Sequence, residues 1–314
     1  MINSEAAPKA VIRQLMPSVK LLTNSTMNRR RKNIMEKSEL LELQKTACKV
    51  RLWTIEGVFN AKSGHPGGSL SAADIMTYLY FKEMNVDPAD PKKPDRDRFV
   101  LSKGHCCPAL YAALALKGYF STDEIKVLRH IGAMLQGHPD MKGTPGVDMS
   151  SGSLGQGVSA ACGMALSAKL SSQDYRVYAM LGDGECEEGQ VWEAAMFAAH
   201  YKLDNLTLFV DFNGLQIDGT VADVAGLSDL QGKFASFGFE VITIDGHDFC
   251  AIEDAVNKAK STKGRPTVII ANTIKGKGVS FMENQVGWHG KAPNADQYKT
   301  AMDELNAQLK AMEA

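Results

Sequence analysis

The chain has 314 residues, of which 44% are hydrophobic and 23% charged, a globular composition with enough length to bury one large core or two small ones. Its formal net charge of −1 argues against binding to nucleic acid or a membrane surface through bulk electrostatics. No stretch approaches the roughly 20 apolar residues that cross a bilayer, and six scattered cysteines without metal-ligand spacing favour a reducing cytoplasm.

The first 35 residues differ from the rest in charge. They hold seven basic residues and one acidic residue, a balance of +6, which leaves −7 for residues 36–314. We expect a basic, disordered tail over 1–35 and one domain over 36–314 that ends in a helical tail over 295–314. A late translation start at Met27 or Met35 also fits. An organelle transit peptide, which is Arg-rich and poor in acidic residues, is a weaker alternative.

Helical and strand patterns alternate along the domain. An apolar periodicity predicts a helix capped by Ser38, which leads to a Gly/Pro-rich loop over 63–68 and a second helix over 71–84. Short apolar strands are expected over 98–102, 177–181, 206–210, 240–244 and 267–271. Helices are expected between them over 158–170, 190–203, 230–237 and 249–261. This alternation predicts an α/β fold, a doubly wound parallel sheet with helices on both faces.

Polar residues follow the predicted strands at the end where ligands bind in such folds. Asp183 ends one strand within Gly182-Asp183-Gly184, and Asn213 ends the next. Because neighbouring strands lie about 5 Å apart, both side chains can ligate one hard cation, Mg²⁺ first, with Ca²⁺ or Mn²⁺ as alternatives. Gly184 lets a diphosphate approach the backbone, beside the N-terminus of the following helix. A plain strand-end turn also uses Asp and Gly, but the second amide favours a metal–diphosphate site.

This spacing resembles the thiamine-diphosphate motif, in which Gly-Asp-Gly is followed after about 25–30 residues by Asn. Further motifs between residues 40 and 291 are similar to those of the transketolase family and stand in the same order. They occupy residues 62–67, 101–105, 137–139, 151–157, 182–189 and 289–290. Two positions depart from the family pattern: Ser153, where Pro is usual, and Phe212, where Asp or Asn is common. Neither departure removes a polar ligand.

The resemblance implies a role for each matching residue. Asp183, Asn213 and the carbonyl oxygen of Leu215 are expected to bind the metal. The residues implied around thiamine diphosphate are His105, Gly152, Ser153, Leu154, Gly184, Glu188, Asn213 and His289. The implied catalytic residues are His65, His105, His138 and His289, since imidazole exchanges protons near neutral pH. Glu188 and Glu193 are expected between neighbouring cofactor sites.

The resemblance also implies the N-terminal subunit of a two-chain transketolase, which moves a two-carbon ketol unit from a ketose (phosphate) to an aldose (phosphate). The family's pyrimidine-binding domain has no counterpart in this sequence. We therefore expect the partner to be a C-terminal transketolase subunit, and we expect self-association and a heterotetramer. The alternatives are a subunit of a 1-deoxyxylulose-5-phosphate synthase-like or 2-oxo-acid dehydrogenase-like enzyme, and a non-catalytic cofactor-binding fragment.

Overall fold

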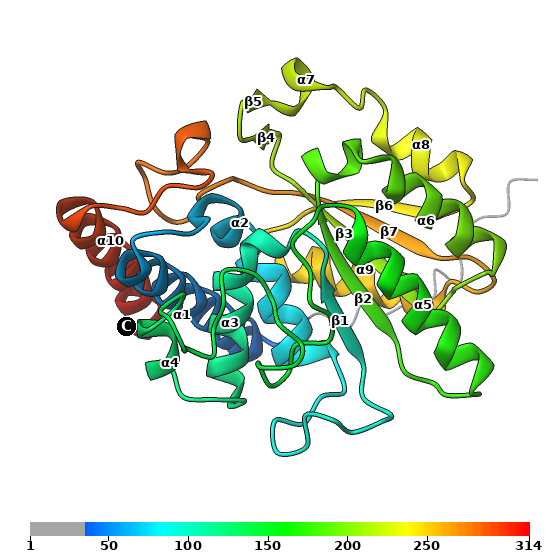
Figure 1. Cartoon of the computed structure of the whole chain (residues 1–314), viewed down its shortest axis with the longest axis horizontal. Helices are drawn as coiled ribbons and strands as arrows, with labels where there is room; N and C mark the ends of the chain where they lie inside the picture. Colours follow the sequence, from blue (N-terminus) through cyan, green and yellow to red (C-terminus); the bar gives the residue numbers. More distant parts are fainter. Residues whose placement is uncertain (1–34) are drawn as a thin grey trace, which may run out of the picture. The chain divides into compact units, whose positions relative to one another are not determined.

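A parallel β-sheet runs through the chain (Figure 1). The computed structural model describes residues 35–314, so the tail expected over 1–35 lies, apart from Met35, outside the described residues. The sheet has five strands in the order β1 (Arg98–Leu101), β2 (Val177–Gly182), β3 (Leu206–Phe212), β7 (Thr267–Asn272) and β6 (Glu240–Asp245). Every neighbouring pair is parallel. These are the five strands expected from the sequence.

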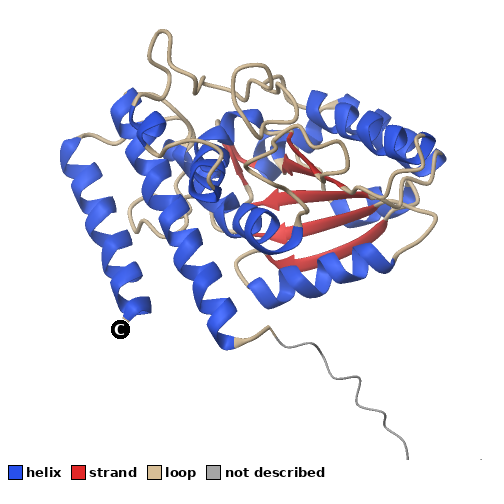
Figure 2. Cartoon of the chain, turned by 90° about the horizontal axis from the view of Figure 1, so that it is seen from below, coloured by secondary structure: helices blue, strands red, loops and turns tan. Residues whose placement is uncertain are grey.

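Helices cover both faces of this sheet, as Figure 2 shows. Side chains alternate along β2: Tyr178 and Met180 join one core, and Ala179 and Leu181 join the other. The first core contains residues of α1 (Lys37–Ala61), α2 (Pro66–Tyr78), α3 (Cys107–Lys117) and α9 (Phe249–Ser261). The second contains residues of α5 (Gln156–Leu170), α6 (Gly189–His200) and α8 (Leu230–Ser236). The doubly wound α/β fold is therefore confirmed, since a parallel sheet must bury both faces.

The remaining elements lie outside these two layers. Helix α10 (Ala295–Glu313) begins with a capping box at Asn294 and packs against α1 through a third apolar cluster. The shorter elements are α4 (Asp123–Lys126), α7 (Val221–Val224) and an antiparallel hairpin of β4 (Leu215–Gln216) and β5 (Gly219–Thr220). No helix between residues 35 and 314 is both long and apolar enough to span a membrane.

Two expected helix starts were wrong. Helix α1 begins at Lys37, and its N-cap is Glu36 rather than Ser38. Helix α2 begins at Pro66, inside the segment expected to be a loop, because proline suits the first helical position. It ends at Tyr78 and continues as a π-helical turn, Leu79–Glu83. Gly68 lies in the first turn, and a Cβ there would lie 2.7 Å from the sulfur of Cys106, so glycine allows this close approach.

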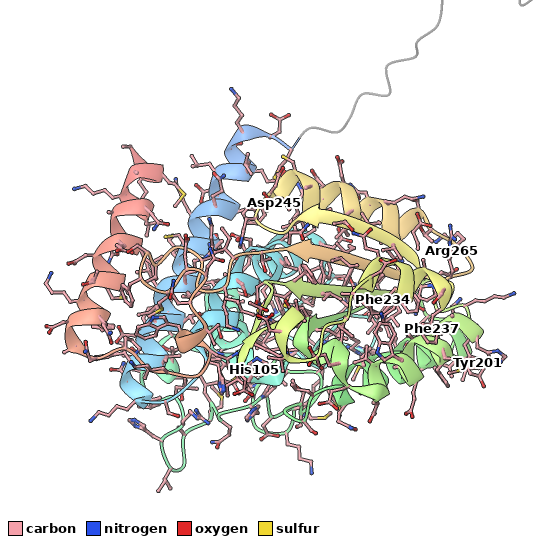
Figure 3. The ribbon with its side chains drawn as sticks, turned by 90° about the horizontal axis from the view of Figure 1, so that it is seen from above. His105, Tyr201, Phe234, Phe237, Asp245 and Arg265 are labelled. Atoms are coloured by element: carbon pink, nitrogen blue, oxygen red, sulfur yellow. The ribbon has the colours of Figure 1, made fainter. Side chains whose placement is uncertain are left out.

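The carboxyl ends of the strands gather on one side of the sheet. Figure 3 shows His105 and Asp245 toward that side and Arg265, which precedes β7, at the other. Gly182 of β2 pairs with Asp211 of β3. The register therefore brings the two predicted metal-binding segments, which follow these strands, to the same edge of the sheet.

Candidate active site

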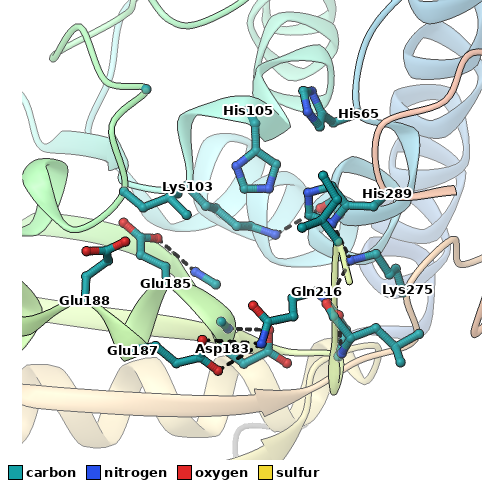
Figure 4. A pocket seen from close by; sticks show the side chains of 18 residues that line it. His65, Lys103, His105, Asp183, Glu185, Glu187, Glu188, Gln216, Lys275 and His289 are labelled. Atoms are coloured by element: carbon teal, nitrogen blue, oxygen red, sulfur yellow. Dashed lines mark hydrogen bonds between the residues drawn. The ribbon is translucent and has the colours of Figure 1, made fainter. Parts of the chain in front are cut away.

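A cavity of about 440 Å³ opens at the carboxyl ends of the strands. Figure 4 shows it from close by. Of the residues expected from the sequence, these line the cavity: His65, His105, Gly152, Leu154, Asp183, Gly184, Glu188, Asn213, Leu215 and His289. They come from six separate stretches of the chain, so the fold brings together most of the predicted site.

Three of the expected residues do not line this cavity. His138 stands behind Gly152, where a Cβ would lie 3.2 Å from the imidazole Cδ2. The side chain of Ser153 is exposed. Glu193 lines a separate cavity of about 300 Å³ on α5 and α6, whereas Glu188 lines the main one. Their proposed roles at an interface between cofactor sites stay a prediction.

The predicted metal-binding residues present oxygen atoms from two neighbouring strand ends. Asp183 is 2% exposed, and its carboxylate accepts N–H bonds from Gly184 at 2.9 Å and Gly214 at 2.5 Å. Burial and the nearby Asp211 carboxylate raise the pKa of Asp183 to about 6. The Oδ1 atom of Asn213 accepts the N–H of Leu215 at 3.2 Å. No cluster of three or more His, Cys, Asp or Glu residues suited to a metal occurs within 35–314. The expected donors here are one carboxylate, one amide and one carbonyl.

Two buried lysines also line the cavity, and sequence reasoning did not assign them a role. Lys103 pairs with the fully buried Asp211 and donates to the Gly68 carbonyl at 3.0 Å. Burial lowers the pKa of Lys103, but Asp211, together with Cys106 and Asp183, outweighs this and raises it overall. Lys275 donates to the Leu215 carbonyl at 2.8 Å, and burial lowers its pKa. Both lysines follow the end of a strand, where ligands bind in this type of fold. Their position in the sequence could therefore have indicated a role in the site.

Three imidazoles meet in the cavity. The ring centroids of His65 and His105 lie 5.1 Å apart, those of His105 and His289 5.3 Å, and those of His65 and His289 5.6 Å. Burial, followed by neighbouring cationic groups, lowers the pKa of His65 and His105 to about 4 and that of His289 to about 3. All three are therefore neutral at neutral pH and able to accept a proton.

The Nδ1 atoms of His289 and His65 differ in their hydrogen bonding. Lys275 Nζ lies 2.9 Å from His289 Nδ1. Because a lysine ammonium can only donate, Nδ1 accepts and the ring proton sits on Nε2. The Nδ1 atom of His65 is buried and has no hydrogen-bond partner among residues 35–314, an arrangement that costs free energy.

Comparison with known proteins identifies the family. The profile of the transketolase thiamine-diphosphate-binding domain matches residues 43–311. The chain belongs to the transketolase family. The chain is 47% identical over 265 residues to the 6-deoxy-6-sulfo-D-fructose transketolase subunit SqwG of Clostridium sp. (strain MSTE9), covering 84% of this chain and 96% of that one. It is 42% identical to an apulose-4-phosphate transketolase subunit of Phocaeicola vulgatus, covering 88% of this chain and 97% of that one.

Solved transketolases share the fold. A transketolase variant from Pichia stipitis superposes with a TM-score of 0.79 at 33% identity, covering 86% of this chain and 44% of that one. The transketolase-family chain described here thus spans less than half of that solved chain, and nearly all of the two subunits.

The cavity of this transketolase-family chain fits a metal-bound diphosphate cofactor on two observations. Its donor set of carboxylate, amide and carbonyl oxygens suits a hard cation such as Mg²⁺. Gly184 faces the cavity, and a Cβ there would reach within 3.2 Å of the Gln216 side chain, closing space a ligand needs.

Glu185, also missed from the sequence, accepts bonds from the backbone N–H groups of Gly155 and Gly182 at 2.9 and 3.0 Å. It thereby ties the glycine-rich loop to the end of β2.

Proposed function

We propose that this chain is the N-terminal subunit of a two-chain transketolase that moves a two-carbon ketol unit from a ketose phosphate to an aldose phosphate. The observation that carries this proposal is the convergence of hard oxygen donors and three neutral imidazoles on one cavity. The near-complete coverage of two transketolase subunits supports the two-chain arrangement.

The proposed assignments follow from the contacts. Asp183, Asn213 and the Leu215 carbonyl would hold Mg²⁺, while Lys103 and Lys275 would balance the diphosphate charge. When bound, thiamine diphosphate supplies the nucleophile and the electron sink for breaking a carbon–carbon bond. The protein's part is to orient the sugars and to move protons.

The imidazole side chains in the cavity are suited to moving these protons. His289 carries its proton on Nε2 because Lys275 occupies Nδ1, so it can donate to a sugar oxygen that gains negative charge. His65 lines the cavity, and a neutral ring there accepts the proton that a sugar hydroxyl loses on bond cleavage. His138 lies against Gly152 but does not line the cavity. It is proposed to reach the hydroxyls of the donor sugar once substrate is bound.

The proposal is tested by assaying the purified chain alone, and then with a candidate C-terminal subunit. Both assays contain thiamine diphosphate and Mg²⁺. The substrate panel should include ordinary ketose phosphates, 6-deoxy-6-sulfo-D-fructose and apulose 4-phosphate, because the two relatives are named for the last two. We expect ketol transfer only in the mixture, together with a mass corresponding to two copies of each chain.

Each other outcome selects another function. Robust turnover by the lone chain contradicts a two-chain enzyme. Consumption of pyruvate with release of CO₂ identifies a 2-oxo-acid or deoxyxylulose-phosphate enzyme, and cofactor binding without turnover identifies a non-catalytic protein. His65→Asn should lose ketol transfer, whereas His200→Asn on the exposed surface of α6 is the matched control and should retain it.

A further inference from the structure

A single guanidinium contacts both loops that carry His65 and His138. Arg129 Nη1 donates to the Ser63 hydroxyl at 2.7 Å, two residues before His65. The same group lies against Gly137, the residue before His138: a Cβ there would stand 2.6 Å from both Nε and Nη2 of Arg129. Arg129 therefore bridges two segments that lie more than 70 residues apart in the sequence.

The loop that carries Arg129 is itself held in one conformation. Arg129 has a φ of 63°, a left-handed conformation that a residue with a side chain adopts only when its surroundings require it. Its N–H donates to the Leu135 carbonyl at 2.9 Å, which closes the loop. The backbone from which the Arg129 side chain extends is therefore held in a defined position.

The His138 loop is held from a second side by helix α3. The Tyr111 hydroxyl lies 2.9 Å from the His138 carbonyl oxygen, and the Cys107 thiol lies 3.2 Å from the Gly137 carbonyl oxygen. Helix α3 and the guanidinium of Arg129 therefore both contact this loop, and losing the guanidinium would leave only the α3 side of this pair in place.

The charge of Arg129 also acts on both imidazoles. Within residues 35–314, its guanidinium forms no ion pair, so its positive charge is not neutralised locally. After burial, the groups that lower the pKa of His65 are His105, Arg129, His138 and Lys275. Those that lower the pKa of His138 are His105 and Arg129. Arg129 is the permanently charged group common to both sets.

We propose that Arg129 is a positioning residue that fixes the two histidine loops relative to each other and places an unpaired positive charge beside both imidazoles. The effect of Arg129 on catalysis rests on the proposed ketol transfer, in which neutral His65 and His138 act on sugar hydroxyls. The bridge itself is independent of that function.

Three variants separate the bridge from the charge. Arg129→Met removes both the bridge and the charge. Arg129→Lys keeps the positive charge but loses the planar guanidinium group that contacts the two loops. Gly137→Ala displaces the guanidinium: the three nearest atoms to the new Cβ all belong to Arg129, and Gly137 is not among the glycines with positive φ. Because those atoms end a flexible side chain, the fold is expected to survive. Lys126→Met, three residues earlier and exposed, is the control.

The first measurement is the titration of each histidine Cε1–H signal by NMR in the full chain, which requires neither partner nor activity. Removing a cation favours the protonated ring. The titration midpoints of His65 and His138 should therefore rise in Arg129→Met and stay near the parent value in Arg129→Lys and Lys126→Met. Gly137→Ala should shift both signals in the parent but have no further effect in the Arg129→Met background.

The second measurement is the pH profile of the assembled enzyme. Arg129→Lys should lower kcat by about ten- to a hundredfold with little change in KM, as expected for misplaced catalytic groups. Arg129→Met should also move the acid limb of the profile to higher pH. Unchanged midpoints in Arg129→Met, together with unchanged signals in Gly137→Ala, would overturn the proposal. Shifted signals in a protein without ketol transfer would uphold the bridge and refute the proposed function instead.

Discussion

Asp183→Asn tests the metal assignment with the smallest change of shape. Asp183 follows β2, is 2% exposed, and accepts N–H bonds from Gly184 and Gly214. Asparagine keeps the size and one oxygen acceptor, but it removes the negative charge that a divalent cation requires. Alanine is the poorer choice, because it would leave both buried N–H groups without an acceptor.

The expected effect on the metal-free protein follows from the raised pKa. The Asp183 carboxyl has a pKa of about 6 in the folded chain, against about 3.9 when unfolded. A raised carboxyl pKa means that the ionised form is disfavoured by folding, so this group lowers stability as pH rises through 4 to 6. At pH 8 the cost is about 3 kcal/mol. Asn avoids that cost, but its NH2 group replaces one carboxylate oxygen and leaves one of the two backbone N–H groups without an acceptor, at about 1–3 kcal/mol.

We therefore expect the metal-free variant to be more stable than the parent at pH 8 by at most about 2 kcal/mol, with this advantage lost as pH falls below 6. Mg²⁺ with thiamine diphosphate should reverse this order. A ligand at 100 times its Kd stabilises the folded state by about 2.7 kcal/mol, and only the parent should bind it.

The assay is urea unfolding at pH 5 and pH 8, with and without Mg²⁺ and thiamine diphosphate. Asp245→Asn is the matched control: Asp245 also ends a strand, but it is exposed and accepts only the His247 N–H, at 2.8 Å. An equal ligand-induced stabilisation of Asp183→Asn and the parent would refute the metal assignment. A variant several kcal/mol less stable than the parent at pH 8 without metal would show that the charge has a structural role instead.

Three further predictions concern other parts of the chain. Asp74→Asn should lower the free energy of unfolding by about 3–5 kcal/mol, because it leaves the buried Arg51 without its carboxylate partner; a loss below 1 kcal/mol in urea unfolding would contradict this. Lys275→Met should weaken binding of thiamine diphosphate with Mg²⁺ at least tenfold by calorimetry, whereas the more exposed Lys277→Met should not, and equal affinities would exclude a role for Lys275. Deleting residues 1–34 should change neither the unfolding midpoint nor turnover, as their composition predicts; a lower Tm would show that they contribute to the fold.

Local sequence pattern was sufficient for the sheet and for placing Asp183 and Asn213 at neighbouring strand ends. The apolar runs predicted β2 and β3 closely, because a strand buried on both faces must be apolar throughout. A short crossover between parallel strands makes them neighbours, so the proximity of Asp183 and Asn213 followed from the chain alone. Helix starts were less predictable. Pro66 and the glycines after it looked like a loop, yet they form the first turn of α2, where proline suits the first position and Cys106 lies close to Gly68.

Only the tertiary structure decided which charges and rings meet. Lys103 follows β1 and pairs with Asp211 of β3, although β2 lies between these strands. Lys275 reaches His289 and the Leu215 carbonyl from the end of β7. These contacts depend on strand order and on side-chain burial, neither of which has a local signal in the sequence. A buried ammonium is stable only where distant segments supply its partners, so its role emerges when the fold is complete.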